Sequence, residues 1–362
     1  MMEGIRPKIV ADPHIPFLKG VLEPYADVVY VDGINITKED VKDADALMIR
    51  LRTQCNEELL GDSDVSIIAT TAVGTDHIDF DFCRRNAIEV YNAQGSTANG
   101  VMQYVFSALY GVASRKAIKM DDYVFGVIGA GNVGLQVARV AKYLGFTVKV
   151  YDPVRIPEEF AEDMATLDEM LEVADVITIH TSLRDGNKGM CNKEFFDKMK
   201  PGAFFINACR GEFVVEEDLM AAVPKLGGVI LDSWLHEPHI NKELMDMVDI
   251  ATPHISGYTL NTKMKGTASV VRTVAHKFGI EELYDFYPEP EGYETIDDVG
   301  LDLKGKNQGE ITAIFQYNYP IFTDDFMFRM DPDAFDKMRD DYQPRREIYI
   351  KELEKYNTKY YK

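Results

Sequence analysis

The segment 123–145 constrains the fold of this chain more than any other stretch. It reads as an apolar run, YVFGVI, followed by GAGNVG and then the amphipathic run LQVARVAKYLG. In a strand–turn–helix unit, the first glycine permits a tight turn, and the second lets a pyrophosphate approach the amides at the positive helix N-terminus. The third permits close packing of helix on strand. The pattern therefore predicts a dinucleotide-binding unit in a parallel sheet.

The next apolar run ends at Asp152, in the sequence KVYD. A carboxylate at this place accepts hydrogen bonds from the adenosine ribose and repels a 2′-phosphate, which favours NAD over NADP. A glycine turn that joins strand and helix without binding a nucleotide is the alternative.

Short apolar runs alternate with amphipathic stretches on both sides of this unit. Strands that are apolar throughout and separated by helices indicate parallel sheets covered on both faces. A long amphipathic stretch, Asn99–Ala113, divides the runs into two sets, so we expect two consecutive α/β domains. The expected strands are Lys8–Asp12, Val28–Val31, Ala46–Ile49, Ile67–Thr71 and Glu89–Tyr91, then Tyr123–Ile128, Val148–Tyr151, Val176–His180, Phe204–Asn207, Gly228–Leu231 and Ile250–Thr252.

The chain changes character after about Lys277 and becomes rich in aromatic residues, which a disordered tail lacks. We therefore expect a folded third piece, in which Pro344 opens a helix at its first turn. Arg345 and Arg346 would then oppose the dipole of that helix. Either an acidic patch on a partner subunit or a substrate phosphate could use these two cations; a solvated helix start is the alternative.

Composition excludes several classes of function. With 60 acidic and 39 basic residues the formal net charge is −21, which argues against binding nucleic acid or an anionic membrane surface. The chain shows neither the apolar core of a signal peptide nor an apolar run long enough to span a membrane, so we expect a soluble, cytoplasmic protein. Dispersed cysteines suit a reducing compartment and give no disulfide framework or zinc site; they are Cys55, Cys83, Cys191 and Cys209.

Three segments place polar residues where predicted strands end: NACRG (207–211), DSWLHEP (232–238) and PHISGY (253–258). Ligands of open α/β sheets bind at the carboxyl ends of strands. Transfer of a hydride from an alcohol needs a base for the hydroxyl proton, and His254 suits that role. Glu237 could orient and charge-stabilise the imidazole, and Arg210 offers a planar fork for a substrate carboxylate.

Each of these residues could instead have a purely structural role. Arg210 could be solvated, His254 could be a core residue, and Glu237 with Pro238 could form a turn. Their arrangement behind a dinucleotide motif favours catalysis. The run His236-Glu237-Pro238-His239 has the wrong spacing for a helical zinc motif and contains a helix-breaking proline, so we expect no metal.

Together, the segments VGTDHID, GAGNVG, HTSL, NACRG, DSWLHEP and PHISGYT resemble the NAD-dependent D-2-hydroxyacid dehydrogenases over roughly residues 8–280. The resemblance implies that Arg210, Glu237 and His254 are catalytic and that hydride passes between NAD and the C2 hydroxyl of a D-2-hydroxy acid. It implies two doubly wound parallel-sheet domains. These are a Rossmann cofactor domain at 97–258 and a flavodoxin-like substrate domain at 1–96 and 259–280.

Within the family, DADALMIR (43–50), VMQYVFSAL (101–109), HISGYTLNTKMKGT and FDKMRDDYQPRRE resemble a subgroup that acts on a phosphorylated four-carbon acid. The resemblance implies a small C-terminal α+β dimerisation domain at 281–362 and hence a homodimer. The residues implied to line the NAD site are Gly129, Gly131, Asn132, Val133, Gly134, Asp152, Thr181, Ala208, Cys209, Asp232 and Gly257. Those implied to face substrate are Arg50, Leu51, Ala72, Val73, Gly74 and Tyr258.

The substrate half departs from the family pattern. Leu51 and Ala72 stand where hydroxyl-bearing residues are expected, and NAQGSTA (92–98) replaces the usual segment; Arg50, Arg52 and Thr53 are near enough to compensate for Leu51. Two alternatives remain open. One is a dehydrogenase of lactate or 3-phosphoglycerate type, and the other is a non-catalytic NAD-sensing regulator, against which the complete Arg–Glu–His set argues.

Overall fold

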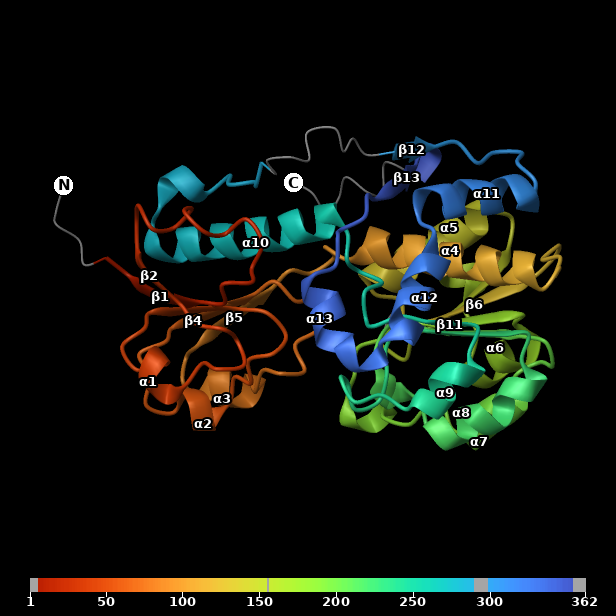
Figure 1. The fold of residues 1–362 in the computed structure, drawn as a ribbon, viewed down its shortest axis with the longest axis horizontal. Coiled ribbons are helices and arrows are strands. Elements are labelled where there is room, and N and C mark those ends of the chain that lie inside the picture. The colour runs from red at the N-terminus through yellow and green to blue at the C-terminus, as the bar shows by residue number, and fades with distance from the viewer. Residues whose placement is uncertain (1–5, 155, 290–298, 354–362) are drawn as a thin grey trace. The chain divides into compact units, whose positions relative to one another are not determined.

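The computed structural model describes residues 6–154, 156–289 and 299–353, and the chain divides into two compact units (Figure 1). Unit 1 comprises Met1–Ser96 and Leu260–Asp297, and unit 2 comprises Thr97–Thr259 and Asp298–Lys362. The chain therefore leaves unit 1 and returns to it later. Of the residues 281–362, which the sequence assigned to a separate domain, those from Asp298 onward group with unit 2 and those before it group with unit 1.

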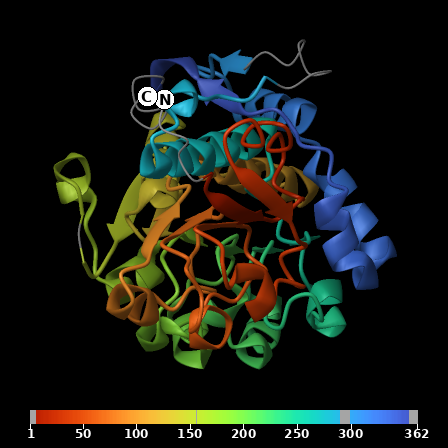
Figure 2. The same ribbon diagram turned by 90° about the vertical axis from the view of Figure 1, so that its left-hand side faces the viewer.

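Unit 1 is a five-stranded parallel sheet in the order β2-β1-β3-β4-β5, a flavodoxin-like order. Alternate residues of its strands face opposite sides: Ile9 and Met48 pack against α10, whereas Val10 and Leu47 lie in a second core beside α2 and α3. Helices cover both faces, as continuously apolar strands require (Figures 1 and 2). The elements are β1 (Lys8–Ala11), β2 (Asp27–Tyr30), α1 (Lys38–Val41), β3 (Ala46–Ile49), α2 (Glu57–Leu60), β4 (Ile67–Thr70), α3 (Phe80–Arg85), β5 (Glu89–Asn92) and α10 (Leu260–Phe278).

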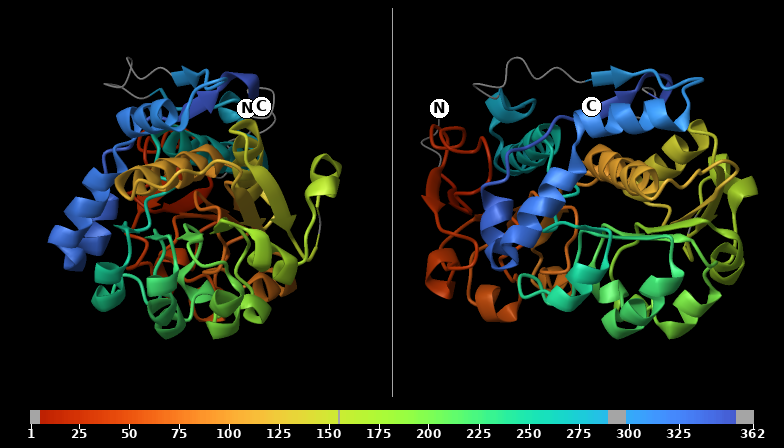
Figure 3. Two further views of the ribbon diagram at one scale, coloured as in Figure 1. Left: turned by 90° about the vertical axis from the view of Figure 1, so that its right-hand side faces the viewer. Right: turned by 45° about the vertical axis from the view of Figure 1, so that its right-hand side comes forward.

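Unit 2 holds a six-stranded parallel sheet in the order β11-β10-β9-β8-β6-β7. Figure 3 shows the orange-yellow α4 on one face of this sheet and the green α7 and α8 on the other. The elements are α4 (Ala98–Arg115), β6 (Val124–Ile128), α5 (Asn132–Tyr143), β7 (Thr147–Tyr151), α6 (Leu167–Val173), β8 (Val176–Ile179), α7 (Lys193–Lys198), β9 (Phe204–Asn207), α8 (Glu216–Ala222), β10 (Gly228–Leu231), α9 (Lys242–Met247) and β11 (Ile250–Ala251).

The order of the strands in unit 2 indicates where a ligand would bind. The chain passes from β6 to β7 on one side and then returns to β8 on the other, so the topological switch point lies between β6 and β8. Ligands of doubly wound sheets bind at such a point, outside the carboxyl ends of the strands. Every strand predicted from the sequence is present in the two sheets, and no end is shifted by more than one residue.

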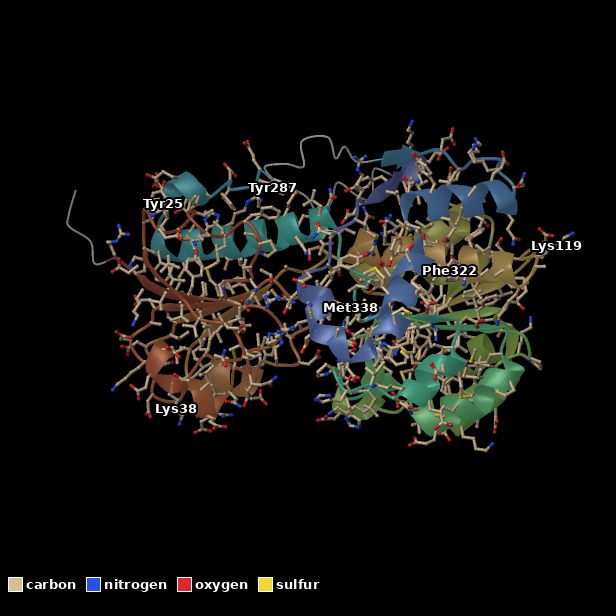
Figure 4. The ribbon with its side chains drawn as sticks, in the orientation of Figure 1. Tyr25, Lys38, Lys119, Tyr287, Phe322 and Met338 are labelled. Carbon is tan, nitrogen blue, oxygen red and sulfur yellow. The ribbon has the colours of Figure 1, made fainter. Side chains whose placement is uncertain are left out.

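The C-terminal segment packs on unit 2 through aromatic side chains. Phe315 stacks on Phe106 and Tyr110 of α4, with ring centroids 6.0 and 5.9 Å apart. Phe322 also lies against α4 (Figure 4), beneath the guanidinium of Arg115. The elements are β12 (Val299–Leu301), α11 (Gln308–Asn318), α12 (Ile321–Met330), α13 (Phe335–Asp340) and β13 (Ile348–Ile350), and β12 pairs with β13 in parallel.

The helix expected to begin at Pro344 is absent, and that prediction is wrong. The backbone is extended around Arg345, and β13 follows at Ile348. Tertiary contacts explain the difference, because the half-buried Arg345 and the buried Glu347 have partners in distant loops. No helix in the described part of the chain is long and apolar enough to cross a membrane.

Candidate active site

The glycine turn after β6 is built as the motif predicts. Gly129 has φ +103°, and a Cβ there would lie 2.4 Å from the carbonyl oxygen of His180. A Cβ on Gly134 would lie 1.9 Å from the carbonyl oxygen of Gly129, so α5 sits directly on the turn. A Cβ on Gly131 would meet nothing within 4 Å, and Gly131 caps α5 without a side-chain hydrogen bond. Two glycines thus serve packing, and the third leaves open space before helix amides that suit an anion.

Asp152 follows β7 and is tied to this turn. Its carboxylate oxygens accept hydrogen bonds from the amides of Ala130 and Val154, both at 2.8 Å. The half-buried carboxylate therefore lies beside the glycine turn, where an adenosine ribose is expected. These residues fit a bound NAD; the individual contact of Asp152 with the ribose stays a prediction.

The ends of β8 and β9 bring further predicted cofactor residues together. The thiol of Cys209 donates to the carbonyl oxygen of Thr181 at 3.0 Å, and the Cys209 amide donates to the Asn207 side chain at 3.1 Å. The Asn207 amide group in turn donates to the carbonyl oxygen of Arg210 at 2.7 Å. Asn207 thus shapes the loop that presents both Cys209 and Arg210.

His254 and Glu237 form a direct pair. The His254 Nδ1 lies 2.8 Å from one Glu237 carboxylate oxygen and 3.1 Å from the other, which also accepts the Trp234 amide at 2.9 Å. Burial raises the pKa of Glu237, but the His254 charge, these hydrogen bonds and the Arg339 charge outweigh it, and the net shift is downward. Glu237 is therefore a carboxylate at neutral pH. It holds a proton on Nδ1 and leaves Nε2 to accept one.

Arg210 follows β9 and lies on a loop that packs against the Glu237 turn. Its Nη1 donates to the carbonyl oxygen of Cys209 at 2.7 Å. A Cβ on Gly211, the next residue, would lie 1.9 Å from the carbonyl carbon of Trp234, so the two loops are in van der Waals contact. The structure thus brings the segments that carry the three predicted catalytic residues to one edge of the sheet in unit 2.

Asp232 has a structural role that the sequence did not indicate. It is fully buried, and its carboxylate accepts hydrogen bonds from the Thr252 hydroxyl at 2.7 Å and the amides of Ile255 and Ser256 at 2.8 and 2.9 Å. Asp232 therefore fixes the loop after His254. Its contact with NAD stays a prediction, as do those of Asn132, Val133, Ala208 and Gly257.

The predicted substrate residues of unit 1 lie after β3 and β4. The Arg50 Nε donates to the buried carboxylate of Asp12 at 3.0 Å. The Asn92 side chain donates to the carbonyl oxygen of Val73 at 2.6 Å, which ties the Ala72–Gly74 loop to the end of β5. Thr53 is buried and donates to the carbonyl oxygen of Gly33 at 2.9 Å, so its hydroxyl is engaged in the fold rather than in compensating for Leu51. Contact of this loop with substrate stays a prediction.

Sequence reasoning missed Arg339, which α13 places near the predicted site. Its guanidinium carbon lies 5.7 Å from the ring centre of Tyr258, and its charge helps lower the pKa of Glu237. The Arg339 Nε is buried and has no hydrogen-bond partner among the described residues. No local pattern links residue 339 to residues 237 and 258, since the contact depends on how α13 packs. Within the described ranges, no cluster of three or more His, Cys, Asp or Glu side chains could hold a metal ion.

Comparison with known proteins also points to a dehydrogenase. Residues 107–256 match the family model described as the D-isomer specific 2-hydroxyacid dehydrogenase, NAD binding domain. An erythronate-4-phosphate dehydrogenase of Bacteroides fragilis is 36% identical over 352 residues, 94% of this chain and 97% of that protein. One of Escherichia coli is 35% identical over 354 residues, 94% of this chain and 92% of that protein.

Solved structures show the same family. The D-lactate dehydrogenase of Aquifex aeolicus, complexed with NAD and lactic acid, has a TM-score of 0.64 and 25% identity, covering 78% of this chain and 100% of that one. The NAD⁺-bound 3-phosphoglycerate dehydrogenase of Entamoeba histolytica has a TM-score of 0.63 and 27% identity, covering 79% of this chain and 99% of that one. The chain therefore belongs to the NAD-dependent D-isomer specific 2-hydroxyacid dehydrogenase family.

Proposed function

We propose that this enzyme oxidises 4-phospho-D-erythronate at C2 to the 2-oxo acid, a step of pyridoxal phosphate synthesis in the cytoplasm. The relatives named erythronate-4-phosphate dehydrogenase align over 94% of this chain, and so include sequence outside the region matched by the family model. The His254–Glu237 pair, with its 2.8 Å hydrogen bond, is the observation that carries the dehydrogenase chemistry.

The residues of unit 2 have distinct tasks in this reaction. The glycine turn after β6 and the loop after β8 would hold NAD, which would supply the hydride acceptor. Arg210 holds the substrate carboxylate and the developing carbonyl oxygen with its planar fork. His254 takes the hydroxyl proton on Nε2, and the Glu237 carboxylate stabilises the imidazolium that results.

Substrate choice is tested by following NADH absorbance with a panel of D-2-hydroxy acids and 2-oxo acids, in both directions. A clear preference for 4-phosphoerythronate or its oxo product supports the proposal and shows that Leu51 and Ala72 are tolerated. A preference for an unphosphorylated acid or for 3-phosphoglycerate keeps the chemistry and refutes the substrate. Silence in both directions, with NAD demonstrably bound, favours an NAD-sensing regulator.

A homodimer formed by the C-terminal segment is part of the proposal. Four large apolar side chains of α11 and α12 are exposed: Tyr317 at 88%, Phe326 at 62%, Met327 at 55% and Met330 at 69%. Exposed apolar surface of this kind typically marks a protein interface. Light scattering of the wild type and of Phe326→Asp tests this inference. A dimer that becomes a monomer supports it, and a wild-type monomer contradicts it.

A further inference from the structure

Arg345 is a half-buried cation in extended backbone, bridged to Thr259 in parallel register. Its guanidinium carbon lies 4.0 Å from the ring centre of Tyr319, and its charge interacts with the nearby Asp324 carboxylate. Burying a charge costs several kcal/mol unless its hydrogen-bond donors are satisfied. The partners of Arg345 therefore show what its burial stabilises.

Those partners are carbonyl oxygens of the loop that follows His254. The Arg345 Nη1 donates to the carbonyl oxygens of Ile255 at 3.1 Å and Tyr258 at 3.3 Å. Its Nη2 donates to the carbonyl oxygen of Ser256, and at 3.1 Å to that of Gly100 in α4. Hydrogen bonds from a charged fork are stronger and more directional than those between neutral groups.

The backbone of Ile255 and Ser256 is also held at its amides by a carboxylate. The amides of Ile255 and Ser256 donate to Asp232, whereas their carbonyl oxygens accept from Arg345. Each residue thus has a negative charge at its amide and a positive charge at its carbonyl. This arrangement, which we call the 255–256 clamp, fixes the backbone next to His254.

His254 depends on this support because its own backbone is strained. It has φ +56°, a left-handed conformation that is unfavourable for a residue with a Cβ. Its amide donates to the carbonyl oxygen of Asp232 at 2.8 Å. Such a conformation persists only where the surrounding structure imposes it, and it sets the direction of the imidazole toward Glu237.

We propose that Arg345 is a positioning residue for proton transfer, which holds the imidazole of His254 in line with Glu237 through the 255–256 clamp. The inference rests on the proposed function in taking His254 as the proton acceptor. It assigns a task to the C-terminal segment within its own chain, separate from dimerisation. It also replaces the expectation that this arginine serves a partner subunit or a substrate phosphate.

Arg345→Lys tests the inference, because an ammonium keeps the charge but lacks the fork that reaches several carbonyls at once. Arg329→Lys is a matched control. Arg329 lies in the same C-terminal segment and donates to the carbonyl oxygens of Met245 in α9 at 2.6 Å and of Val248 after that helix at 3.0 Å, neither of which belongs to the loop that follows His254. Both variants remove a guanidinium group that donates to backbone carbonyl oxygens. If Arg345 had only a structural role, the two variants should therefore lose similar stability and similar activity.

The measurements are urea unfolding, NADH-binding stoichiometry, kcat and KM for the hydroxy acid, and the kinetic isotope effect with C2-deuterated substrate. We expect Arg345→Lys to lower kcat per NADH-binding site about tenfold, with little change in KM. The isotope effect should rise as the chemical step becomes limiting. Arg329→Lys should lose comparable stability and keep kcat and the isotope effect unchanged. Equal behaviour of the two variants, or a loss explained by fewer NADH-binding sites, overturns the inference.

Two further variants distinguish a failure of the positioning role from a failure of the proposed function, and keep the test possible if Arg345→Lys does not fold. If Arg345→Lys does not fold, Asp324→Asn replaces it, because the Asp324 carboxylate accepts the hydroxyls of Tyr319 and Tyr342 beside the guanidinium, both at 2.8 Å. An unchanged kcat in that variant then overturns the inference. His254→Gln is measured in the same series. If it retains turnover, His254 is not the proton acceptor and both proposals fall; if it is inactive while Arg345→Lys is normal, only the positioning role is lost.

Discussion

Replacing Glu237 by glutamine changes one oxygen atom and should nevertheless disable proton transfer. One carboxylate oxygen accepts the Trp234 amide at 2.9 Å, and the other lies 2.8 Å from the His254 Nδ1. In Glu237→Gln the Trp234 N–H selects the amide oxygen for the first position, which turns the NH₂ group toward Nδ1. The imidazole must then accept on Nδ1 and carry its proton on Nε2, where it cannot take one from substrate.

The size of the defect follows from the alternative arrangement. Turning the amide to restore the productive tautomer leaves the Trp234 N–H without an acceptor, which costs about 1–3 kcal/mol. Loss of the negative charge beside the imidazolium adds roughly 1.5 kcal/mol, the difference between a charged and a neutral hydrogen bond. Together these give about 2.5–4.5 kcal/mol, or a fall in kcat of roughly 10²–10³-fold.

The assay is the initial rate of NADH formation at saturating substrate, with NADH binding measured separately by fluorescence. Because the pKa of Glu237 is shifted downward, the wild-type residue stays ionised across the neutral range, so the substitution removes a negative charge at the assay pH. Glu237→Asp, which keeps the charge but shortens the reach, should lose less activity. A glutamine variant within tenfold of wild type would refute the argument that this carboxylate sets the tautomer.

Three further predictions concern residues of unit 2. His254→Ala should retain NADH binding and lose kcat by about 10²-fold or more, and near-normal turnover would remove it from the mechanism. Gly131→Ala should unfold like wild type in urea yet bind NAD more weakly, whereas Gly134→Ala should lose more than about 2 kcal/mol of stability, because its Cβ would meet a carbonyl oxygen at 1.9 Å. Burial lowers the pKa of His180 to about 3. Only the unfolded chain then takes up that proton between about pH 6.5 and 3. The free energy of unfolding therefore decreases as the pH is lowered through this window. Relative to His180→Gln, the wild type should lose about 2 kcal/mol of unfolding free energy between pH 7.5 and 5.0, measured in urea; a constant difference would show that His180 is protonated in the native state.

The sequence predicted those features whose determinants are local. Strands such as Ala46–Ile49 are apolar at every position, which indicates a sheet covered on both faces, and GAGNVG carries its own geometric requirements. The pairing of His254 with Glu237 followed from the expectation that carboxyl ends of parallel strands meet at one edge.

What the sequence did not predict depends on long-range contacts. Pro344 is compatible with a helix start, but the carbonyl oxygens of Ile255 and Ser256 bind the next residue in extended backbone, and tertiary contacts override local propensity. Asp232 was assigned to cofactor binding by the family resemblance, and burial and two amide donors also give it a role in the fold. No periodicity or spacing in one chain reports such pairings.

The discontinuity of unit 1 has a consequence for how the protein is made. The face of its sheet that includes Ile9 and Met48 is closed by Val270, Val271 and Val274 of α10. A ribosome synthesises the five strands first and must complete all of residues 97–259 before α10 emerges, which takes about 10–30 s at roughly 5–20 residues per second. During that interval the nascent chain presents an uncovered apolar sheet to the ribosome surface and to chaperones. A fragment that stops before α10 should therefore aggregate, even though it contains every strand of the sheet.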